Sequence, residues 1–207
     1  MADAKSRNRI PYRQLQALET KRRIARAART LFATLGYAGT TMEAIAEETG
    51  VAVRTVYAAF GTKKAILGAV CDEWLAEADV RSLMGQAMAE KDVQRKIALL
   101  AQLDRQQWER GPDVIAVLQS AATTDADVAR MLKGWIQPRN EILAQVVEGI
   151  AGSLKHGLDP TTATAILRAL GSAEVYHELV VECGWSPDRY QEWLTGTLNQ
   201  QLLGRPS

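Results

Sequence analysis

Apolar side chains recur along the chain at intervals of three and four residues, the spacing that places them on one face of an α-helix. In the segment from about Arg13 to Leu35 these positions are Leu15, Leu18, Ile24, Ala28, Leu31, Phe32 and Leu35. The same spacing predicts helices over residues 92–109, 113–122, 125–149 with a break or kink at Pro138, 160–183 and 187–203. No segment alternates with a period of two, so we expect an all-α fold of about nine helices.

Glycines divide the region after the first helix into short predicted helices. The breaks lie at Gly36, Gly39, Gly50 and Gly61, and the helices between and after them are predicted over 42–49, 53–60 and 63–78. Two short helices joined by a tight turn form the pattern of a helix-turn-helix. The turn at Gly50 requires positive φ, which glycine adopts without a Cβ penalty. Because the two helices must approach closely, the residue one turn earlier should be small, and it is Ala46.

The second short helix has an outward face that could enter the major groove of DNA. Its outward positions are Val53, Arg54, Thr55, Tyr57 and Ala58. Arg54 is the only long hydrogen-bond donor on this face. Its best partner is the O6 and N7 edge of guanine, so Arg54 is the candidate for reading a base.

Charge is unevenly distributed, which supports a nucleic-acid partner. The 207 residues carry a net charge of +1, but residues 1–70 hold 12 Lys and Arg against 5 Asp and Glu, whereas residues 71–207 hold 13 against 19. A basic N-terminal part on an acidic remainder is typical of a chain whose beginning meets a polyanion. Residues 1–12 include Lys5, Arg7 and Arg9 and are predicted to form a flexible basic arm that could enter a minor groove.

Several short motifs occur together between residues 20 and 70. They are Leu31-Phe32-Ala33, Gly36-Tyr37, Thr40-Thr41, Ile45-Ala46, Gly50-Val51, Thr55-Val56-Tyr57, Phe60 and Lys63-Lys64-Ala65-Ile66-Leu67. Their combination resembles the tetracycline-repressor (TetR/AcrR) family of one-component bacterial regulators, and a looser resemblance lies at 176–179 and 184–194. The resemblance implies a DNA-binding domain over 13–66 and an effector-binding and dimerisation domain over 67–207.

The resemblance also implies roles for particular side chains. Thr40 and Thr41 look like phosphate ligands at a helix N-terminus, where free N–H groups favour an anion. Tyr57 is similar to a tyrosine whose hydroxyl reaches a phosphate, and Lys63 to a lysine that pairs with the DNA backbone at the next helix start. This chain departs from the family where Ala52 replaces a usual serine cap, and where Ala58 and Ala59 replace aromatic or basic residues.

The last two predicted helices are apolar on more than one side, so each can face both its own domain and a partner. The resemblance implies that they form a four-helix bundle with their copies in a second subunit, giving a twofold homodimer. The residues expected at this interface are Ile166, Leu170, Ala173, Val180, Trp193, Leu194 and Leu198. The alternative is that both sides pack within one subunit.

The region between residues 80 and 180 is expected to hold a small-molecule effector. Candidate lining residues are Leu99, Leu103, Trp108, Leu118, Met131, Trp135 and Tyr176. Their aromatic and aliphatic character suggests a largely apolar ligand, although plain core packing is the alternative for each of them. The helix over 63–78 would couple effector binding to the DNA-binding domain.

Other chemistry is not indicated. The two histidines, His156 and His177, have no Cys or carboxylate at metal-ligand spacing, and Cys71 and Cys183 are too far apart in sequence for a CxxC knuckle, so no metal and no cofactor are expected. There is no phosphate-binding loop, no nucleophile elbow and no apolar run of membrane-spanning length. We therefore expect a cytoplasmic bacterial protein, associated with the nucleoid when bound to DNA, and not an enzyme.

These observations predict a dimeric DNA-binding transcriptional regulator. The predicted activity is that of a repressor released from a pseudo-palindromic operator in double-stranded DNA by a small, largely apolar effector. Two alternatives remain open from the sequence: a DNA-binding regulator with no small-molecule effector, and a helical enzyme or interaction module with a coincidental helical hairpin.

Overall fold

The computed structural model describes residues 11–204, and the chain divides into two compact units, Met1–Cys71 and Asp72–Ser207. Apart from an isolated bridge between Leu154 and Leu203, the regular structure of the described residues is helical, which confirms the predicted all-α fold. The described part contains the α-helical segments α1 to α11, more than the nine or so predicted. The difference comes from one helix that was not predicted and from a predicted helix that is divided.

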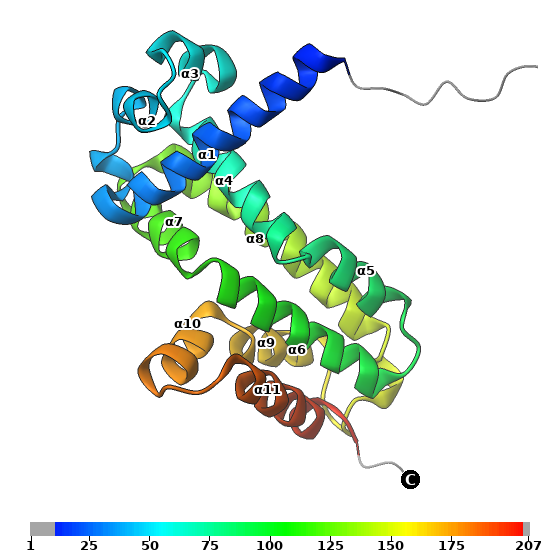
Figure 1. The fold of residues 1–207 in the computed structure, drawn as a ribbon. Helices are drawn as coiled ribbons and strands as arrows, with labels where there is room; N and C mark the ends of the chain where they lie inside the picture. Colours follow the sequence, from blue (N-terminus) through cyan, green and yellow to red (C-terminus); the bar gives the residue numbers. More distant parts are fainter. Residues whose placement is uncertain (1–10, 205–207) are drawn as a thin grey trace, which may run out of the picture. The chain divides into compact units, whose positions relative to one another are not determined.

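The first unit consists of α1 (Tyr12–Gly39), α2 (Met42–Thr49), α3 (Val53–Phe60) and the first turns of α4 (Lys63–Glu77). The bounds of α2 and α3 are those predicted from the sequence. Helix α1 packs against both short helices (Figure 1). The fully buried side chains Ile24, Phe32, Ile45, Val56 and Ile66 form the core of this unit.

The N-terminal turns of α1 do not belong to that core. Leu15 and Leu18 were predicted to face it, but each side chain is 48% exposed. Burial in α1 begins only at Ile24, and the earlier turns run past the short helices (Figure 1). The helix begins at Tyr12, so the last residue of the predicted flexible arm is helical, while residues 1–10 of that arm lie outside the described residues.

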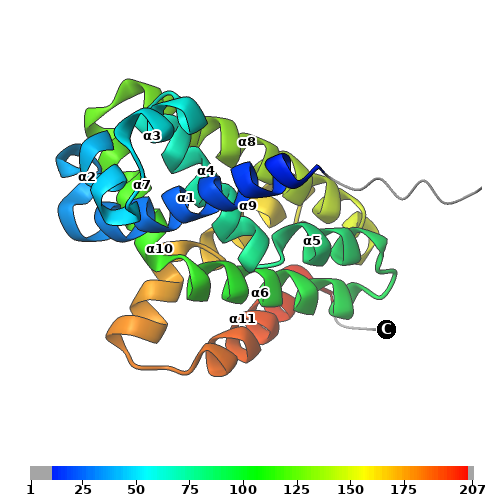
Figure 2. The same ribbon diagram turned by 45° about the horizontal axis from the view of Figure 1, so that its top comes forward.

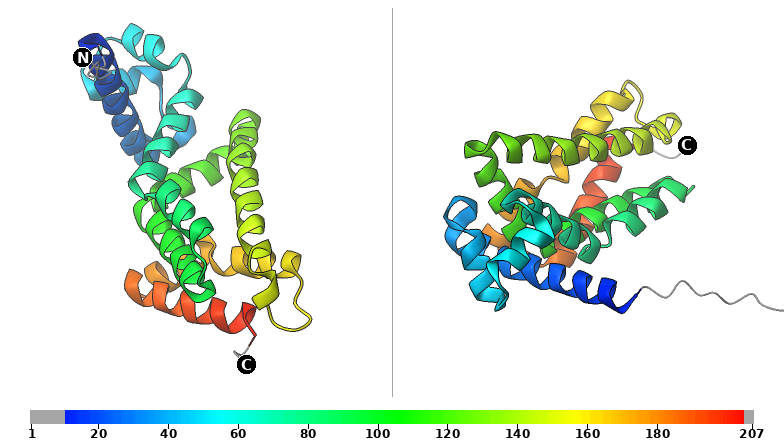
Figure 3. Two further views of the ribbon diagram at one scale, coloured as in Figure 1. Left: turned by 90° about the vertical axis from the view of Figure 1, so that its right-hand side faces the viewer. Right: turned by 90° about the horizontal axis from the view of Figure 1, so that it is seen from above.

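The second unit is a helical bundle. It contains the end of α4, then α5 (Val80–Ala89), α6 (Val93–Arg110), α7 (Pro112–Thr124), α8 (Ala126–Glu148), a 3₁₀ turn (Ala151–Ser153), α9 (Pro160–Leu170), α10 (Ala173–Tyr176), a π-helical turn (His177–Glu182) and α11 (Pro187–Leu202). Helix α6 packs against α5 and α11 (Figure 2), and α8 packs against α7 and α9 (Figure 3). Helices α6, α8, α9 and α11 begin at capping side chains, which are Asp92, Asp125, Asp159 and Ser186.

Helix α5 was not predicted, although its sequence contains the signal. Leu83, Met84 and Ala87 are buried at helical spacing. The helix follows Asp79, which has a φ of 52° in the left-handed region and separates α5 from α4.

Helix continuity differs from the prediction at two places. A break or kink was predicted at Pro138, and helix α8 continues there without a break; Pro138 is exposed, so water can reach the carbonyl that proline leaves without a partner. The predicted helix over 160–183 instead ends at Leu170 and restarts after Ser172, whose hydroxyl accepts a hydrogen bond from the Val175 N–H. At this break Gly171 lies so close to Asp104 that a Cβ atom would meet the carboxylate at 2.0 Å.

Candidate nucleic-acid interface and ligand cavity

The turn between α2 and α3 has the geometry that the sequence predicted. Gly50 has φ 66° and ψ 24°, and its N–H donates a hydrogen bond to the Glu47 carbonyl at 3.1 Å. The Val51 N–H donates to the Ala46 carbonyl, also at 3.1 Å. The Ala46 side chain is buried, which confirms that a small residue was needed one turn before the glycine. These bonds fix α3 against α2 in one orientation.

Helix α3 presents most of its side chains to solvent. Val56 is its one buried residue, whereas Arg54 and Ala58 are exposed, Tyr57 is 47% exposed, and Val53 and Thr55 are partly exposed. Ala52, the residue before the helix, makes no side-chain capping bond, as predicted. The first-turn N–H groups therefore lack a protein side-chain cap, and Arg54 is the long donor beside them.

The two threonines before α2 have different roles, contrary to the prediction that both bind phosphate. The Thr41 hydroxyl is the N-cap, accepts a hydrogen bond from the Ala44 N–H at 3.0 Å and is exposed, so its own proton is available to an anion. Thr40 is completely buried, and its hydroxyl donates to the Gly36 carbonyl at 2.9 Å. Thr40 therefore stabilises the end of α1 and cannot present its hydroxyl to DNA.

Lys63 also differs from its predicted role. Its ammonium group donates hydrogen bonds to the carbonyls of Tyr37 at 2.6 Å, Thr40 at 2.8 Å and Ala38 at 3.4 Å. It also lies 4.4 Å from the centre of the Tyr37 ring. An ammonium has three N–H donors, so these carbonyls account for all of them. Lys63 closes the carboxyl end of α1 instead of extending toward a phosphate.

Two basic side chains of α1 support the short helices, a role that sequence reasoning missed. The Arg23 guanidinium donates to the Thr49 carbonyl at 2.6 Å, at the end of α2 where carbonyls lack helical partners. The Lys21 ammonium lies 5.5 Å from the centre of the Phe60 ring at the end of α3. The signal was the spacing of these residues, one and three positions before the buried Ile24.

The second unit contains a cavity of about 640 Å³ lined mostly by apolar side chains. Four of the seven residues predicted to contact an effector line it: Leu103, Trp108, Leu118 and Trp135. The other apolar lining includes Trp74, Leu75, Met84, Leu132 and Ile136. One stretch of wall is rigid, because the Trp74 indole N–H donates to the Gln107 carbonyl at 2.8 Å and packs so tightly on Gly111 that a Cβ there would lie 2.0 Å from the indole nitrogen.

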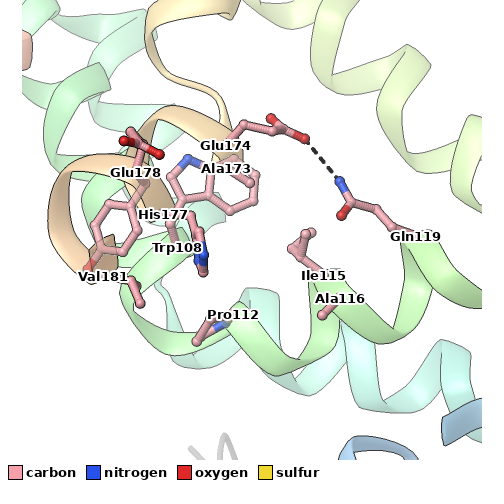
Figure 4. Close-up of a pocket in the computed structure, with 11 residues that line it drawn as sticks. Trp108, Pro112, Ile115, Ala116, Gln119, Ala173, Glu174, His177, Glu178 and Val181 are labelled. Carbon is pink, nitrogen blue, oxygen red and sulfur yellow. Dashed lines mark hydrogen bonds between the residues drawn. The ribbon is translucent and has the colours of Figure 1, made fainter. Parts of the chain in front are cut away.

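A smaller hollow of about 440 Å³ shares Trp108 with this cavity and reaches Tyr176 (Figure 4). Glu174 and Gln119, which line both hollows, are joined by a hydrogen bond of 3.0 Å. Of the other predicted lining residues, Leu99 faces a separate groove beside α5, and Met131 lines none of the described cavities. The structure thus does not bring Leu99 and Met131 to the large cavity, because periodicity alone does not tell which side of a helix faces a void.

An ion pair between Arg139 and the buried Asp104 borders the larger cavity. The Arg139 guanidinium lies 3.1 Å from the Asp104 carboxylate, and its centre lies 5.9 Å from the Trp108 ring. Burial raises the pKa of the Asp104 carboxyl from 3.8 to about 7, and the charge and hydrogen bond of Arg139 lower it in part. Arg139 lines the cavity, whereas Asp104 is not among its lining residues. The cavity thus presents a cation whose counter-ion lies behind it.

The residues predicted at a subunit interface are divided between the surface and the core. Leu194 and Leu198 are fully buried within the second unit, where α11 packs on α6, so they offer no surface to a partner. Ile166, Leu170, Ala173, Val180 and Trp193 are partly exposed. The break after Leu170 also means that these residues do not form one continuous stripe.

Residues 11–204 contain neither an arrangement of side chains for a metal ion nor a helix suited to cross a membrane. No set of three or more His, Cys, Asp and Glu side chains there is arranged to hold a metal ion. No helix in this part is both long enough and apolar enough to cross a membrane.

Part of the sequence matches a known protein family. Residues 24–70, which include α2, the turn and α3, match the sequence profile described as "Bacterial regulatory proteins, tetR family". No curated protein sequence matches significantly.

Solved structures share the fold over most of the chain. NalD, the secondary repressor of the MexAB-OprM multidrug efflux pump in Pseudomonas aeruginosa, is 19% identical with a TM-score of 0.74, covering 92% of this chain and 100% of that one. The SmeT–triclosan complex is 19% identical with a TM-score of 0.74, covering 90% and 93%. FadR from Bacillus subtilis, in complex with stearoyl-CoA, is 20% identical with a TM-score of 0.69, covering 86% and 96%. The helix-turn-helix part of this chain thus matches the tetR family of bacterial regulatory proteins, and the chain shares its fold with these solved structures.

Proposed function

We propose that the protein is a homodimeric repressor that binds a pseudo-palindromic operator and is released by a small, largely apolar molecule. The observation that carries the proposal is the exposed face of α3, held by the Gly50 turn and supported from α1 by Arg23 and Lys21. A rigid, exposed helix with an arginine in its first turn is suited to reading base edges in a major groove. Its place of action would be the nucleoid, where the operator lies.

The proposed DNA contacts follow from exposure and available donors. Arg54 reads a guanine, Thr41 and Tyr57 hydrogen-bond phosphates, and Val53, Thr55 and Ala58 make short contacts to base edges. Thr40 and Lys63 take part only by holding the end of α1 in place. Arginines 13, 22 and 26 lie on exposed positions of α1 and add to the positive charge of the domain.

Dimerisation is proposed because one short helix reads few base pairs. Two copies related by a dyad read half-sites in successive major grooves, about 34–36 Å apart. The partly exposed residues Ile166, Leu170 and Trp193 on α9 and α11 remain available for such an interface. Analytical ultracentrifugation of the full chain tests this proposal, and a monomer at micromolar concentration would contradict it.

Release by a ligand is proposed because the second unit contains a cavity of a size typical of small-molecule sites. SmeT in complex with triclosan and FadR in complex with stearoyl-CoA share this fold, and their ligands support a small-molecule site in the present chain. The largely apolar lining suits a ligand of the same character. Helix α4 contributes residues to both units and is the covalent connection through which ligand binding would shift the population of DNA-binding conformations.

The test is selection from random double-stranded DNA with the purified full chain, repeated with Arg54→Ala and with the control Arg81→Ala, an exposed arginine of α5. We expect an inverted repeat, and we expect Arg54→Ala to relax one symmetry-related base pair, a loss of about 1–3 kcal/mol of discrimination. Arg81→Ala should leave the selected motif unchanged. Recovery of no motif, or an unchanged motif with Arg54→Ala, would contradict the proposed reading by α3.

A further inference from the structure

The polar end of the large cavity identifies the chemical class of the ligand. We infer that the cavity binds an amphipathic molecule with one acidic head, such as a carboxylate, which the Arg139 guanidinium holds while the apolar body lies among Trp74, Leu118 and Trp135. This inference rests on the proposed function, because it assumes that the cavity is a ligand site.

Placement of charge favours an anion over a cation. Arg139 lines the cavity, and its counter-ion Asp104 does not. A ligand entering from the cavity therefore meets the guanidinium first. The other two charged lining residues, Arg168 and Glu174, are exposed, and Glu174 already accepts a hydrogen bond from Gln119. A cationic head would face Arg139 without reaching the carboxylate behind it.

Unpartnered polar atoms belong to three residues that line the cavity. The Arg139 Nε, the Asn140 Oδ1 and the Gln107 Oε1 are buried without a hydrogen-bond partner, and all three residues line the cavity. A buried polar group without a partner is unfavourable, so a cluster of three beside one void indicates an occupant that completes them. An acid oxygen accepts from the guanidinium, and an amide turned by half a rotation offers its NH₂ group to the same head.

The surroundings of Arg139 allow its guanidinium to exchange Asp104 for the acid group of a ligand. The Arg139 guanidinium lies over the Trp108 ring, 5.9 Å from its centre, so the ring offers it a contact that does not depend on Asp104. Asp104 is almost completely buried, and its raised pKa means that its carboxyl takes up a proton readily when Arg139 turns to another anion. The phenol of Tyr190 lies near enough to Asp104 for the carboxylate to raise its pKa in addition to burial, so Tyr190 carries no charge in the neutral range.

Three probes of equal chain length separate the head group from the apolar body. Octanoate, 1-octanol and octyltrimethylammonium would be titrated into the full chain, with binding followed by calorimetry and by fluorescence of the tryptophans in the wall. We expect octanoate to bind at least about tenfold more tightly than the other two, because it alone is an anion and can accept two hydrogen bonds from Arg139 while pairing with its charge.

Variants assign that preference to one residue. Arg139→Gln should remove the preference for octanoate, whereas Arg130→Gln, at an exposed arginine of the same helix, should keep it. Because Arg139→Gln leaves Asp104 buried without a counter-ion and can unfold the chain, Asp104→Asn provides a second test. It keeps Arg139 and removes its competitor, so octanoate should bind more tightly than to the unchanged chain.

The outcomes separate this inference from the function on which it rests. Equal binding of the three probes, preference for the cation, or loss of preference in Arg168→Gln instead of Arg139→Gln would overturn the acidic-head assignment and leave the cavity as a ligand site. Binding of none of the probes would overturn both the assignment and the proposed release by a ligand. DNA selection with Arg54→Ala would still test the DNA-binding function independently.

Discussion

Replacement of Asp104 by asparagine should change how the stability of the second unit depends on pH. The carboxyl is almost completely buried, and burial raises its pKa from 3.8 to about 7 although Arg139 opposes the shift. The folded state therefore binds a proton more tightly than the unfolded state. A group of this kind stabilises the fold fully below the unfolded pKa, and that stabilisation is lost as pH rises through the folded pKa, here between about pH 4 and about pH 7.

The size of the effect follows from the linkage relation. Each pH unit of pKa difference corresponds to about 1.4 kcal/mol, so the whole shift corresponds to about 4 kcal/mol. Between about pH 5 and about pH 8 the unchanged chain should lose about 3 kcal/mol from this group alone. Asp104→Asn has no carboxyl to titrate and should not show this loss, so its stability relative to the unchanged chain should rise with pH by the same amount.

Urea unfolding followed by tryptophan fluorescence measures the difference, because Trp108 lies beside the ion pair. The chain concentration must be the same in every sample, since a dimer's stability depends on it. Asp72→Asn, at an exposed carboxylate, is the control and should follow the unchanged chain at both pH values. A stability difference between Asp104→Asn and the unchanged chain that stays constant from about pH 5 to about pH 8 would refute the argument that burial outweighs the Arg139 charge.

Two further predictions concern single contacts. Lys63→Met should lower the free energy of unfolding by about 1–3 kcal/mol, because it removes an ammonium that donates hydrogen bonds to three carbonyls. The logarithm of the operator affinity should fall with the logarithm of salt concentration at an unchanged slope. A slope reduced by about one per subunit would show that Lys63 neutralises a phosphate. Gly111→Ala should destabilise the second unit by about 3 kcal/mol or more in the same unfolding assay, since its Cβ would overlap the Trp74 indole. Gly134→Ala, with open space around the added methyl group in α8, should instead stabilise by about 0.5–1 kcal/mol, and similar behaviour of both variants would contradict the close contact at Gly111.

The parts that could be predicted from sequence are those governed by local spacing. The bounds of α2 and α3 and the positive φ at Gly50 follow from residues within one or two turns of each other. The roles of Lys63 and Arg139 could not be predicted in this way. Lys63 bonds to Tyr37, 26 positions earlier, and Arg139 pairs with Asp104, 35 positions earlier. The packing of distant segments determines which residues become partners, and a periodic pattern in the sequence does not reveal it.

The break between α9 and α10 is another feature that local spacing could not predict. Gly171 was read as one residue of a long helix because the apolar spacing continues on both sides of it. The chain turns there because Ser172 caps a new helix and the backbone passes close against Asp104. Exposure is likewise decided by packing: Leu194 and Leu198 have the spacing of a partner-facing stripe but are covered by α6.

The apolar lining of the large cavity and the two glycines that pack on Trp74 and Asp104 differ in how freely they can vary during evolution. Leucine, isoleucine and methionine at Leu75, Met84 or Leu132 can replace one another for less than about 1.5 kcal/mol and would reshape the apolar part. Gly111 and Gly171 cannot accept any side chain, because Trp74 and Asp104 occupy the space. Descendants of this protein could therefore acquire ligands with differently shaped bodies by ordinary substitution, while the backbone on either side of Trp108 and the ion pair beside it stay as they are.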